Sequence, residues 1–208
     1  MNEGWLSAKY ESGGKSYGSV NERTAREDAG GWTYGRHQLA TIRGAFPEFY
    51  KHLEKYPKIL AQLESAGGLP AAISGSPNFV SMWKYLGNDP AMAEAQHSFF
   101  LREYRDGAKA IADEHGLPWS NEGVRESIIS AYVNGKSMAK NAVARVAETF
   151  SRGGAKAFVA ALYDERYKRR ADGALAYYAK NSKAIQDSLV HPTKGRYVNE
   201  KAEALSLA

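Results

Sequence analysis

Two carboxylates near the N-terminus, Glu11 and Asp28, have the types and surroundings of a proton-transferring pair. Glu11 follows Tyr10 and precedes Gly13-Gly14, so it is expected in the last turn of a first helix, where the dipole and desolvation raise a carboxyl pKa. A raised pKa suits a general acid at neutral pH. Asp28 opens a Gly-rich loop, and a loop can hold a second carboxylate far enough away to leave room for water, as in glycosidases.

Each of these carboxylates also has a purely structural interpretation. Glu11 can be an exposed side chain before a Gly helix stop, and Asp28 can be an exposed turn residue beside glycines with positive φ. Glu22 and Glu27 lie in the same loop as Asp28, and their spacing from Glu11 does not exclude either of them as the second carboxylate.

Five further side chains are candidates for contact with water or a sugar. Thr33 can hydrogen-bond the attacking water, and Tyr34 can either stack on a sugar or pack in the core. His37 and Gln38 can line a cleft, although Gln38 can equally satisfy backbone groups of a hairpin. Asn134 can donate to an N-acetyl group or cap the C-terminus of its helix.

The elements expected to position these residues are mostly short helices. Ser76-Pro77, Asp89-Pro90 and Asn121 give helix start signals, Gly135 gives a stop, and Ser137 is a candidate cap for the following helix. Residues 16–38 lack helical periodicity and contain short β-prone pieces between glycines. The sequence therefore predicts an α+β, predominantly α-helical protein with a small β-hairpin or sheet lobe after the first helix.

Composition excludes several classes of protein. The 208 residues include no Cys, so disulfide scaffolds, thiol nucleophiles and Cys-ligated zinc are excluded. The five His are scattered without metal-ligand spacing, and we expect neither a metal nor another cofactor. No repeat or linker divides the chain, so one domain over residues 1–208 is expected.

Charge is unevenly distributed along the chain. Residues 151–208 hold 11 basic and 6 acidic side chains and so account for the whole net charge of +5. This basic, helical C-terminal part is expected to contact anionic envelope polymers, although a run such as RYKRR is also typical of a solvated helix face. The N-terminus has no apolar run of signal-peptide length, which predicts synthesis in the cytoplasm without a signal peptide.

The two acidic motifs resemble the catalytic region of lysozyme-like peptidoglycan hydrolases from phage lysins and secretion-associated spike proteins, distant relatives of the chitosanases. The matching segments are Tyr10-Glu11-Ser12-Gly13-Gly14, Asp28-Ala29-Gly30-Gly31-Trp32-Thr33-Tyr34-Gly35 and His37-Gln38-Leu39, together with Phe79, Trp83, Leu86 and the run Ala95-Gln96-His97-Ser98-Phe99. Ala29 replaces the usual Pro, Asn134 stands where relatives tend to have Gln, and the family's C-terminal G-W-x-x-R ending is absent.

This resemblance implies a lysozyme-like fold and a peptidoglycan hydrolase that cleaves the β-1,4 bond between N-acetylmuramic acid and N-acetylglucosamine. It implies that Glu11 is the general acid, Asp28 the second carboxylate and Thr33 a holder of the attacking water, with inversion at the anomeric carbon. The expected partner is the peptidoglycan glycan strand, reached by a monomer that a holin, a virion or a secretion apparatus delivers to the cell wall.

Two other enzymatic functions and two non-enzymatic ones remain open at this stage. A lytic transglycosylase needs Glu11 alone, and a chitosanase needs acidic groups along its cleft, of which the sequence has no obvious excess. A basic helical module that binds nucleic acid would account for residues 151–208 but not for the Gly-rich loop. A structural component of a virion or secretion apparatus is the other non-enzymatic alternative. We therefore expect an enzyme, with no specific nucleic-acid partner.

Overall fold

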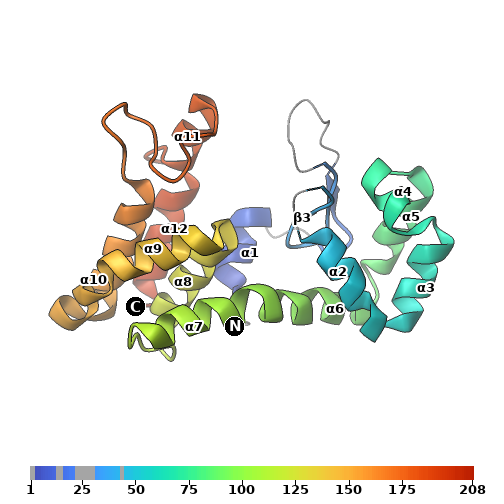
Figure 1. Cartoon of the computed structure of the whole chain (residues 1–208), viewed down its shortest axis with the longest axis horizontal. Coiled ribbons are helices and arrows are strands. Elements are labelled where there is room, and N and C mark those ends of the chain that lie inside the picture. Colours follow the sequence, from blue (N-terminus) through green and yellow to red (C-terminus); the bar gives the residue numbers. More distant parts are fainter. Residues whose placement is uncertain (1–2, 13–15, 22–30, 43–44) are drawn as a thin grey trace. The chain divides into compact units, whose positions relative to one another are not determined.

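The computed structural model describes residues 3–12, 16–21, 31–42 and 45–208 (Figure 1). These residues are predominantly α-helical with one small three-stranded sheet, which confirms the predicted α+β class. In chain order the elements are α1 (Trp5–Ser12), β1 (Val20–Asn21), β2 (Thr33–Tyr34), β3 (Leu39–Ala40), α2 (Phe46–His52), the 3-10 turn η1 (Leu53–Lys55), α3 (Pro57–Ser65), α4 (Gly68–Ser74), α5 (Pro77–Leu86), α6 (Pro90–Phe100), the π-helical turn η2 (Leu101–Arg105), α7 (Asp106–Glu114), α8 (Glu122–Asn134), α9 (Lys136–Val146), α10 (Glu148–Tyr167), α11 (Lys183–Leu189) and α12 (Arg196–Ser206).

The chain forms two compact units. The first unit comprises Met1–Tyr10 and Glu103–Ala208, and the second comprises Glu11–Arg102. The chain therefore passes between the units twice, once within α1 and once within the π-helical turn η2. A single domain over residues 1–208 stays a prediction.

Helix ends follow the local start and stop signals in the sequence. The Asp89 side chain accepts a hydrogen bond from the Ala91 N–H at 2.8 Å, and Asn121 accepts one from the Val124 N–H at 2.9 Å. Helix α8 ends directly before Gly135, as expected. The prediction for Ser137 was wrong: α9 begins at Lys136, so Ser137 lies inside the helix and Gly135 takes the cap position.

The sheet is antiparallel with the strand order β1-β2-β3. Thr33 in β2 pairs with Asn21 in β1 and with Ala40 in β3, so Thr33 lies on the central strand. The β element begins inside the predicted range of 16–38 and extends two residues beyond it. The central strand is thereby fixed from both sides by backbone hydrogen bonds.

An aromatic core fills the second unit. The Tyr34 ring lies 4.9 Å from that of Phe46, 5.5 Å from that of Phe79 and 5.1 Å from that of Trp83, measured between ring centroids. All four side chains are fully buried. Burying a large apolar side chain contributes about 1.5–3 kcal/mol, so this cluster holds β2 against α2 and α5.

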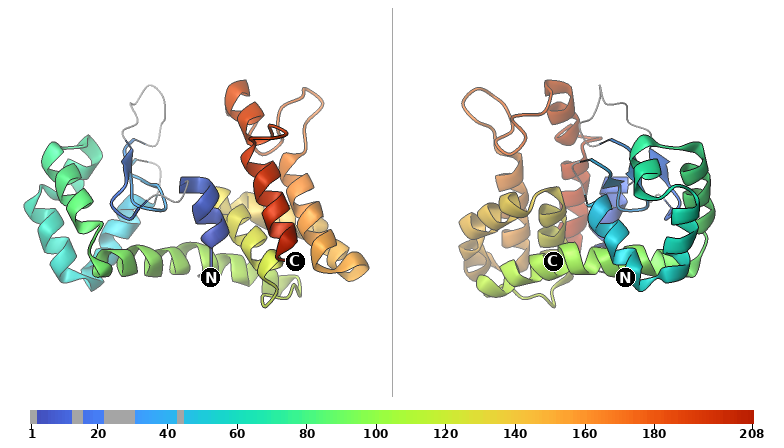
Figure 2. Two further views of the ribbon diagram at one scale, coloured as in Figure 1. Left: turned by 180° about the vertical axis from the view of Figure 1, so that it is seen from behind. Right: turned by 45° about the vertical axis from the view of Figure 1, so that its right-hand side comes forward.

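The first unit is a helical assembly around α8, which contacts α7, α9, α10 and α12 (Figure 2). At its centre the Arg166 guanidinium lies 3.6 Å from the Glu200 carboxylate, and both side chains are fully buried. The rings of Tyr163 and Tyr197 lie 4.7 Å and 4.5 Å from the guanidinium carbon. Burial raises the pKa of Glu200, but the charges of Arg166 and Arg196 outweigh it and hold that pKa below its ordinary value.

This centre corrects the expectation of a basic solvated helix at RYKRR. Arg166 is a core residue, and α10 ends at Tyr167, so Lys168, Arg169 and Arg170 lie outside any helix. The basic part is therefore helical only in α10, α11 and α12, with a non-helical segment from 168 to 182.

In the described part of the chain, no helix is both long and apolar enough to span a membrane.

Candidate functional site

Glu11 lies in the last turn of α1, which ends at Ser12 before the glycines, as the sequence predicted. Its side chain lies outside the described part of the structure. The carbonyl end of a helix disfavours a negative charge, so this position is suited to a carboxyl that must stay protonated until it reacts. Side chains of α8 and α12 hold α1 in place.

The N-terminal end of α1 is anchored by a buried carboxylate of α8. Glu126 accepts hydrogen bonds from the N–H groups of Gly4 at 2.9 Å and Leu6 at 3.2 Å, and its side chain is fully buried. Burial raises the pKa of Glu126, although these two N–H groups favour its charged form. Because the first N–H groups of a helix have no partner within the helix, this carboxylate sets where α1 begins.

A second anchor lies toward the other end of α1. Glu203 in α12 accepts hydrogen bonds from the Tyr10 hydroxyl at 2.9 Å and from the Lys9 ammonium at 2.7 Å. Burial and the Glu203 charge raise the pKa of Tyr10 to about 12, so its hydroxyl stays protonated as the donor. The two residues that precede Glu11 are thus both held by the same carboxylate.

Thr33 and Gln38 form a hydrogen-bonded group on the sheet. The Thr33 hydroxyl donates to Gln38 Oε1 at 3.4 Å, and the Asn21 amide donates to the same oxygen. Gln38 Nε2 donates to the Gly35 carbonyl at 3.2 Å. Gln38 therefore satisfies groups of the hairpin, which was the alternative to its predicted role in sugar binding, and it holds the Thr33 hydroxyl in place.

Gln96 is a positioning residue that the sequence analysis did not single out. It is fully buried in α6, where its Oε1 accepts a hydrogen bond from the Arg36 N–H at 3.1 Å and its Nε2 donates to the Tyr17 carbonyl at 2.9 Å. Gly35 has φ of 77°, and a Cβ there would overlap the Gln96 amide. Gly35 is thus required both by conformation and by close approach. The buried polar Gln in an A-Q-H run was the available signal.

The structure contradicts the prediction that Tyr34 contacts a sugar. Tyr34 is fully buried, and its hydroxyl donates to the Ala72 carbonyl at 2.9 Å. Its ring is surrounded by the aromatic core described above, so it has no surface to offer to a glycan. The alternation along the strand allowed Tyr34 to lie either on the solvent side or on the core side of the sheet. Packing against α2, α4 and α5 places it on the core side.

His37 lies half-buried against Phe100. The two rings are stacked, with 4.3 Å between their centroids and 19° between their planes. Desolvation, together with the positive charges of Arg36 and His97, lowers the pKa of His37 to about 3. Any contact that His37 makes with a sugar is therefore that of a neutral imidazole.

Asn134 is the last residue of α8 and belongs to the first unit. Its Nδ2 donates to the Ser130 carbonyl at 2.7 Å, and its Oδ1 accepts from the hydroxyls of Tyr178 at 3.4 Å and Tyr197 at 3.2 Å. These contacts support a role at the helix C-terminus. Its predicted contact with an N-acetyl group stays a prediction.

Asp28 lies outside the described residues, as do Glu22 and Glu27. The pairing of Glu11 with a second carboxylate therefore stays a prediction. Thr33, His37 and Gln38 belong to the second unit, which also contains the sheet.

The sequence matches over residues 3–201 the family described as type VI secretion system spike protein VgrG3-like, C-terminal. The chain belongs to this family. A comparison with curated protein sequences finds no match. The family match spans every helix and strand from α1 to α11 and the first half of α12, so these elements belong to one VgrG3-like region.

Solved structures share the fold of this VgrG3-like chain. They include the native chitosanase from Bacillus subtilis MY002, with 21% identity and a TM-score of 0.54, and a variant of that chitosanase in complex with six GlcN, with 20% identity and a TM-score of 0.55. Each match covers 97% of this chain and 82% of the other. The predicted lysozyme-like α+β fold is thereby confirmed.

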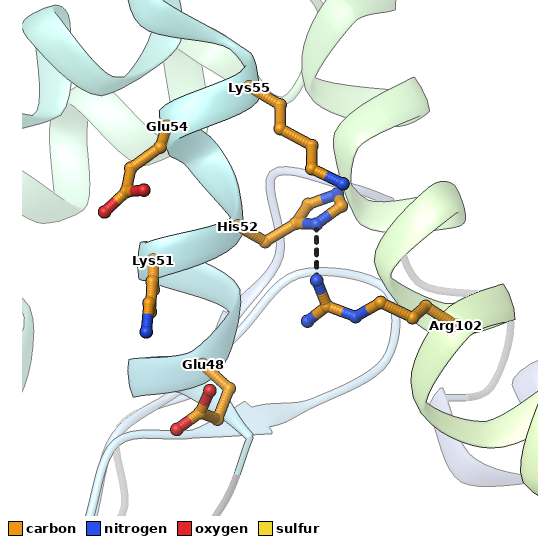
Figure 3. Close-up of a pocket in the computed structure, with 6 residues that line it drawn as sticks. All are labelled: Glu48, Lys51, His52, Glu54, Lys55 and Arg102. Carbon is orange, nitrogen blue, oxygen red and sulfur yellow. Dashed lines mark hydrogen bonds between the residues drawn. The ribbon is translucent and has the colours of Figure 1, made fainter.

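A polar pocket of about 350 Å³ also lies in the second unit of the VgrG3-like chain. Arg102 Nη1 donates to His52 Nδ1 at 3.2 Å, so His52 carries its proton on Nε2, which lies 3.0 Å from Ser98 Oγ. In Figure 3, Lys55 and Arg102 reach toward His52, whereas Glu54 points away from it. The pocket is lined by Glu48, Lys51, His52, Glu54, Lys55 and Arg102.

This pocket and the described side chains do not form a metal centre. Among the residues that the structure describes, no three His, Asp or Glu side chains are grouped so that they could hold a metal ion. The pocket has two lysines and one arginine against two glutamates, which favours anions over cations.

Proposed function

We propose that this VgrG3-like chain is a glycoside hydrolase that cleaves the β-1,4 bonds of peptidoglycan glycan strands. The observation that carries the proposal is the position of Glu11 at the end of an anchored helix, in a chain that shares 97% of its length with a chitosanase fold. The resemblance of its two acidic motifs to peptidoglycan hydrolases supports the N-acetylated cell-wall glycan as substrate.

In the proposed reaction Glu11 protonates the oxygen of the leaving sugar. Asp28 takes a proton from a water molecule on the opposite face of the ring, and this water attacks the anomeric carbon with inversion. Thr33 helps to hold that water, and its hydroxyl is already held by Gln38. Each proton transfer by a positioned side chain accelerates such a reaction by roughly 100-fold to 10,000-fold.

Hydrolysis of chitosan is the second candidate. It is favoured by one observation, the shared fold with a chitosanase whose variant was solved with six GlcN. A lytic transglycosylase is a third possibility, in which the muramic 6-hydroxyl replaces water and Asp28 is not needed. The presence of both Asp28 and Thr33 supports hydrolysis over transglycosylation.

Delivery by a secretion apparatus follows from the proposal and the family. The matched family is described as the C-terminal part of a type VI secretion system spike protein, and a hydrolase carried on a spike would be brought to the cell wall with that spike. We expect it to act there as a monomer on glycan strands.

The test is digestion of purified peptidoglycan and of chitosan, with the products identified by mass spectrometry. Hydrolysis of peptidoglycan yields reducing muramic or glucosamine ends, whereas anhydro-muramic ends would reassign the enzyme as a transglycosylase. Products from chitosan alone would establish the chitosanase candidate instead. Glu11→Gln is the control, because it removes the proton donor with little change of shape.

A further inference from the structure

Helix α5 carries a polar stripe on its outer surface, opposite the side that packs in the core. Asn78, Ser81 and Tyr85 are exposed, whereas Phe79 and Trp83 are fully buried. Because these three residues are spaced by 3 and 4 positions, they lie along one face of the helix. At the rise of an α-helix, the stripe is about 10 Å long.

This stripe borders a shallow pocket between α3 and α5. The pocket measures about 420 Å³. Helices α3 and α5 contact each other directly, and both lie within the second unit (Figure 1). Half-buried Met82 contributes an apolar surface beside Tyr85. The lining consists of Ser65, Ala66, Asn78, Ser81, Met82 and Tyr85.

Tyr85 is the exceptional residue of this pocket. It is 71% exposed, more than any other large hydrophobic side chain of the described residues. Within that part of the chain its ring has no aromatic or cationic partner and its hydroxyl has no hydrogen bond. An aromatic ring this exposed leaves an apolar face in water, which an apolar face of a ligand can cover.

The chemistry of the lining indicates which ligand fits. None of the six lining side chains is charged, so a charged partner gains no ion pair here. The amide of Asn78 and the hydroxyls of Ser65 and Ser81 supply both donors and acceptors beside the ring. A pyranose has the same two properties, an apolar face of C–H groups and a rim of hydroxyls.

We propose that the surface formed by Ser65, Asn78, Ser81, Met82 and Tyr85 binds a neutral β-1,4-linked N-acetylated glycan strand at a site other than the proposed catalytic one. Tyr85 stacks on one sugar ring, while Asn78 and Ser81 hydrogen-bond the adjoining ring. This inference rests on the proposed function for the identity of the polymer. Binding there would keep the enzyme on an insoluble substrate between cleavage events.

The test measures co-sedimentation of the full chain with purified insoluble peptidoglycan. Every variant carries Glu11→Gln so that the polymer is not consumed. We expect Tyr85→Ala to weaken binding by about 5-fold to 20-fold, because ring stacking is lost. Tyr85→Phe keeps the ring and should bind within about 2-fold of the parent. Lys84→Ala, at an exposed neighbouring position of α5, is the matched control and should bind like the parent.

Equal binding by the Tyr85→Ala and parent proteins, with unchanged thermal midpoints, would overturn the inference. It would leave the proposed function intact if the wild-type chain still cleaves peptidoglycan. Conversely, Tyr85-dependent binding in a chain that cleaves no glycan would uphold the surface and refute the proposed activity. Equal loss for Lys84→Ala would show that α5 itself was perturbed and would also count against the inference.

Discussion

Glu11 is the side chain on which the proposed reaction depends most. We expect Glu11→Gln to reduce turnover of peptidoglycan by about 1,000-fold or more, because the amide cannot donate the proton that the leaving oxygen needs. The free energy of unfolding should change little, since the substitution keeps the shape of a side chain at a helix end. Reducing-end release and urea denaturation measure the two effects.

The second carboxylate is tested by the three acidic residues of the loop. We expect Asp28→Asn to be nearly as severe as Glu11→Gln, and Thr33→Ala to be milder, because placing the water is one contribution among several to the barrier. Glu22→Gln and Glu27→Gln are the matched controls. If either of them abolished turnover while Asp28→Asn did not, the general base would have to be reassigned.

His37 gives a prediction about pH. Its pKa of about 3 lies below the ordinary value of 6.5, so between these values the unfolded chain binds a proton that the folded chain does not. Stability is therefore expected to fall as the pH drops from about 6.5 toward 3, and His37→Phe should remove this part of the slope. A nitrogen-15 NMR titration should find the imidazole neutral at pH 5. A midpoint near 6.5 would show that the ring is solvated.

At the scale of elements, α1 is held by carboxylates from two other helices. We expect Glu126→Gln to lower the free energy of unfolding by about 1–3 kcal/mol, because one amide oxygen cannot serve both the Gly4 and Leu6 N–H groups and a buried donor is left unpaired. Urea denaturation measures the loss. Because Glu11 lies in the last turn of α1, turnover at a temperature where the protein stays folded should also fall.

Glu122→Gln is the control for this anchor. Glu122 also accepts a hydrogen bond from α1, through the Trp5 ring N–H at 3.1 Å, but its side chain is 32% exposed and water can replace the contact. We expect a loss below about 1 kcal/mol. Equal losses for both substitutions would mean that burial of the carboxylate is not what makes the Glu126 anchor strong.

For the molecule as a whole, the contact with anionic polymers stays a prediction, and the ion pairs of the structure suggest a different set of lysines for it. Of the 11 basic residues in 151–208, eight lie within ion-pair distance of a carboxylate, and Lys156, Lys180 and Lys194 have no such partner among the described residues. In the second unit, Lys51, Lys55 and Lys58 have no ion-pair partner among the described residues. Exposed, unpaired charges act mainly on encounter and retention.

We therefore expect neutralisation of Lys51, Lys55 and Lys58 by Gln to weaken binding to an anionic wall polymer more than neutralisation of Lys168, Arg169 and Arg170. The difference should disappear above physiological salt, where the Debye length falls below about 8 Å. Binding isotherms at two ionic strengths measure it. A larger loss of binding on neutralisation of Lys168, Arg169 and Arg170 would show that the C-terminal part makes the contact.

Features that depend on near neighbours along the chain could be predicted from the sequence. The end of α1 at Ser12, the caps at Asp89 and Asn121 and the stop at Gly135 follow from side chains and glycines within a turn of the helix end, where local hydrogen bonds and allowed φ dominate. The α+β class and the place of Glu11 in a last turn could be predicted for this reason.

The burial of particular polar and aromatic groups, by contrast, could not be predicted without the packing of distant elements. Arg166 read as part of a solvated basic run because its partner Glu200 lies 34 residues further along the chain. Tyr34 read as a possible sugar contact because alternation along a strand does not say which face α2 and α5 will cover. Gln96 stood in a run shared with relatives, but its positioning role was missed because that role depends on Arg36 and Tyr17, which are distant in sequence. Burial is set by long-range packing, and no local pattern carries that information.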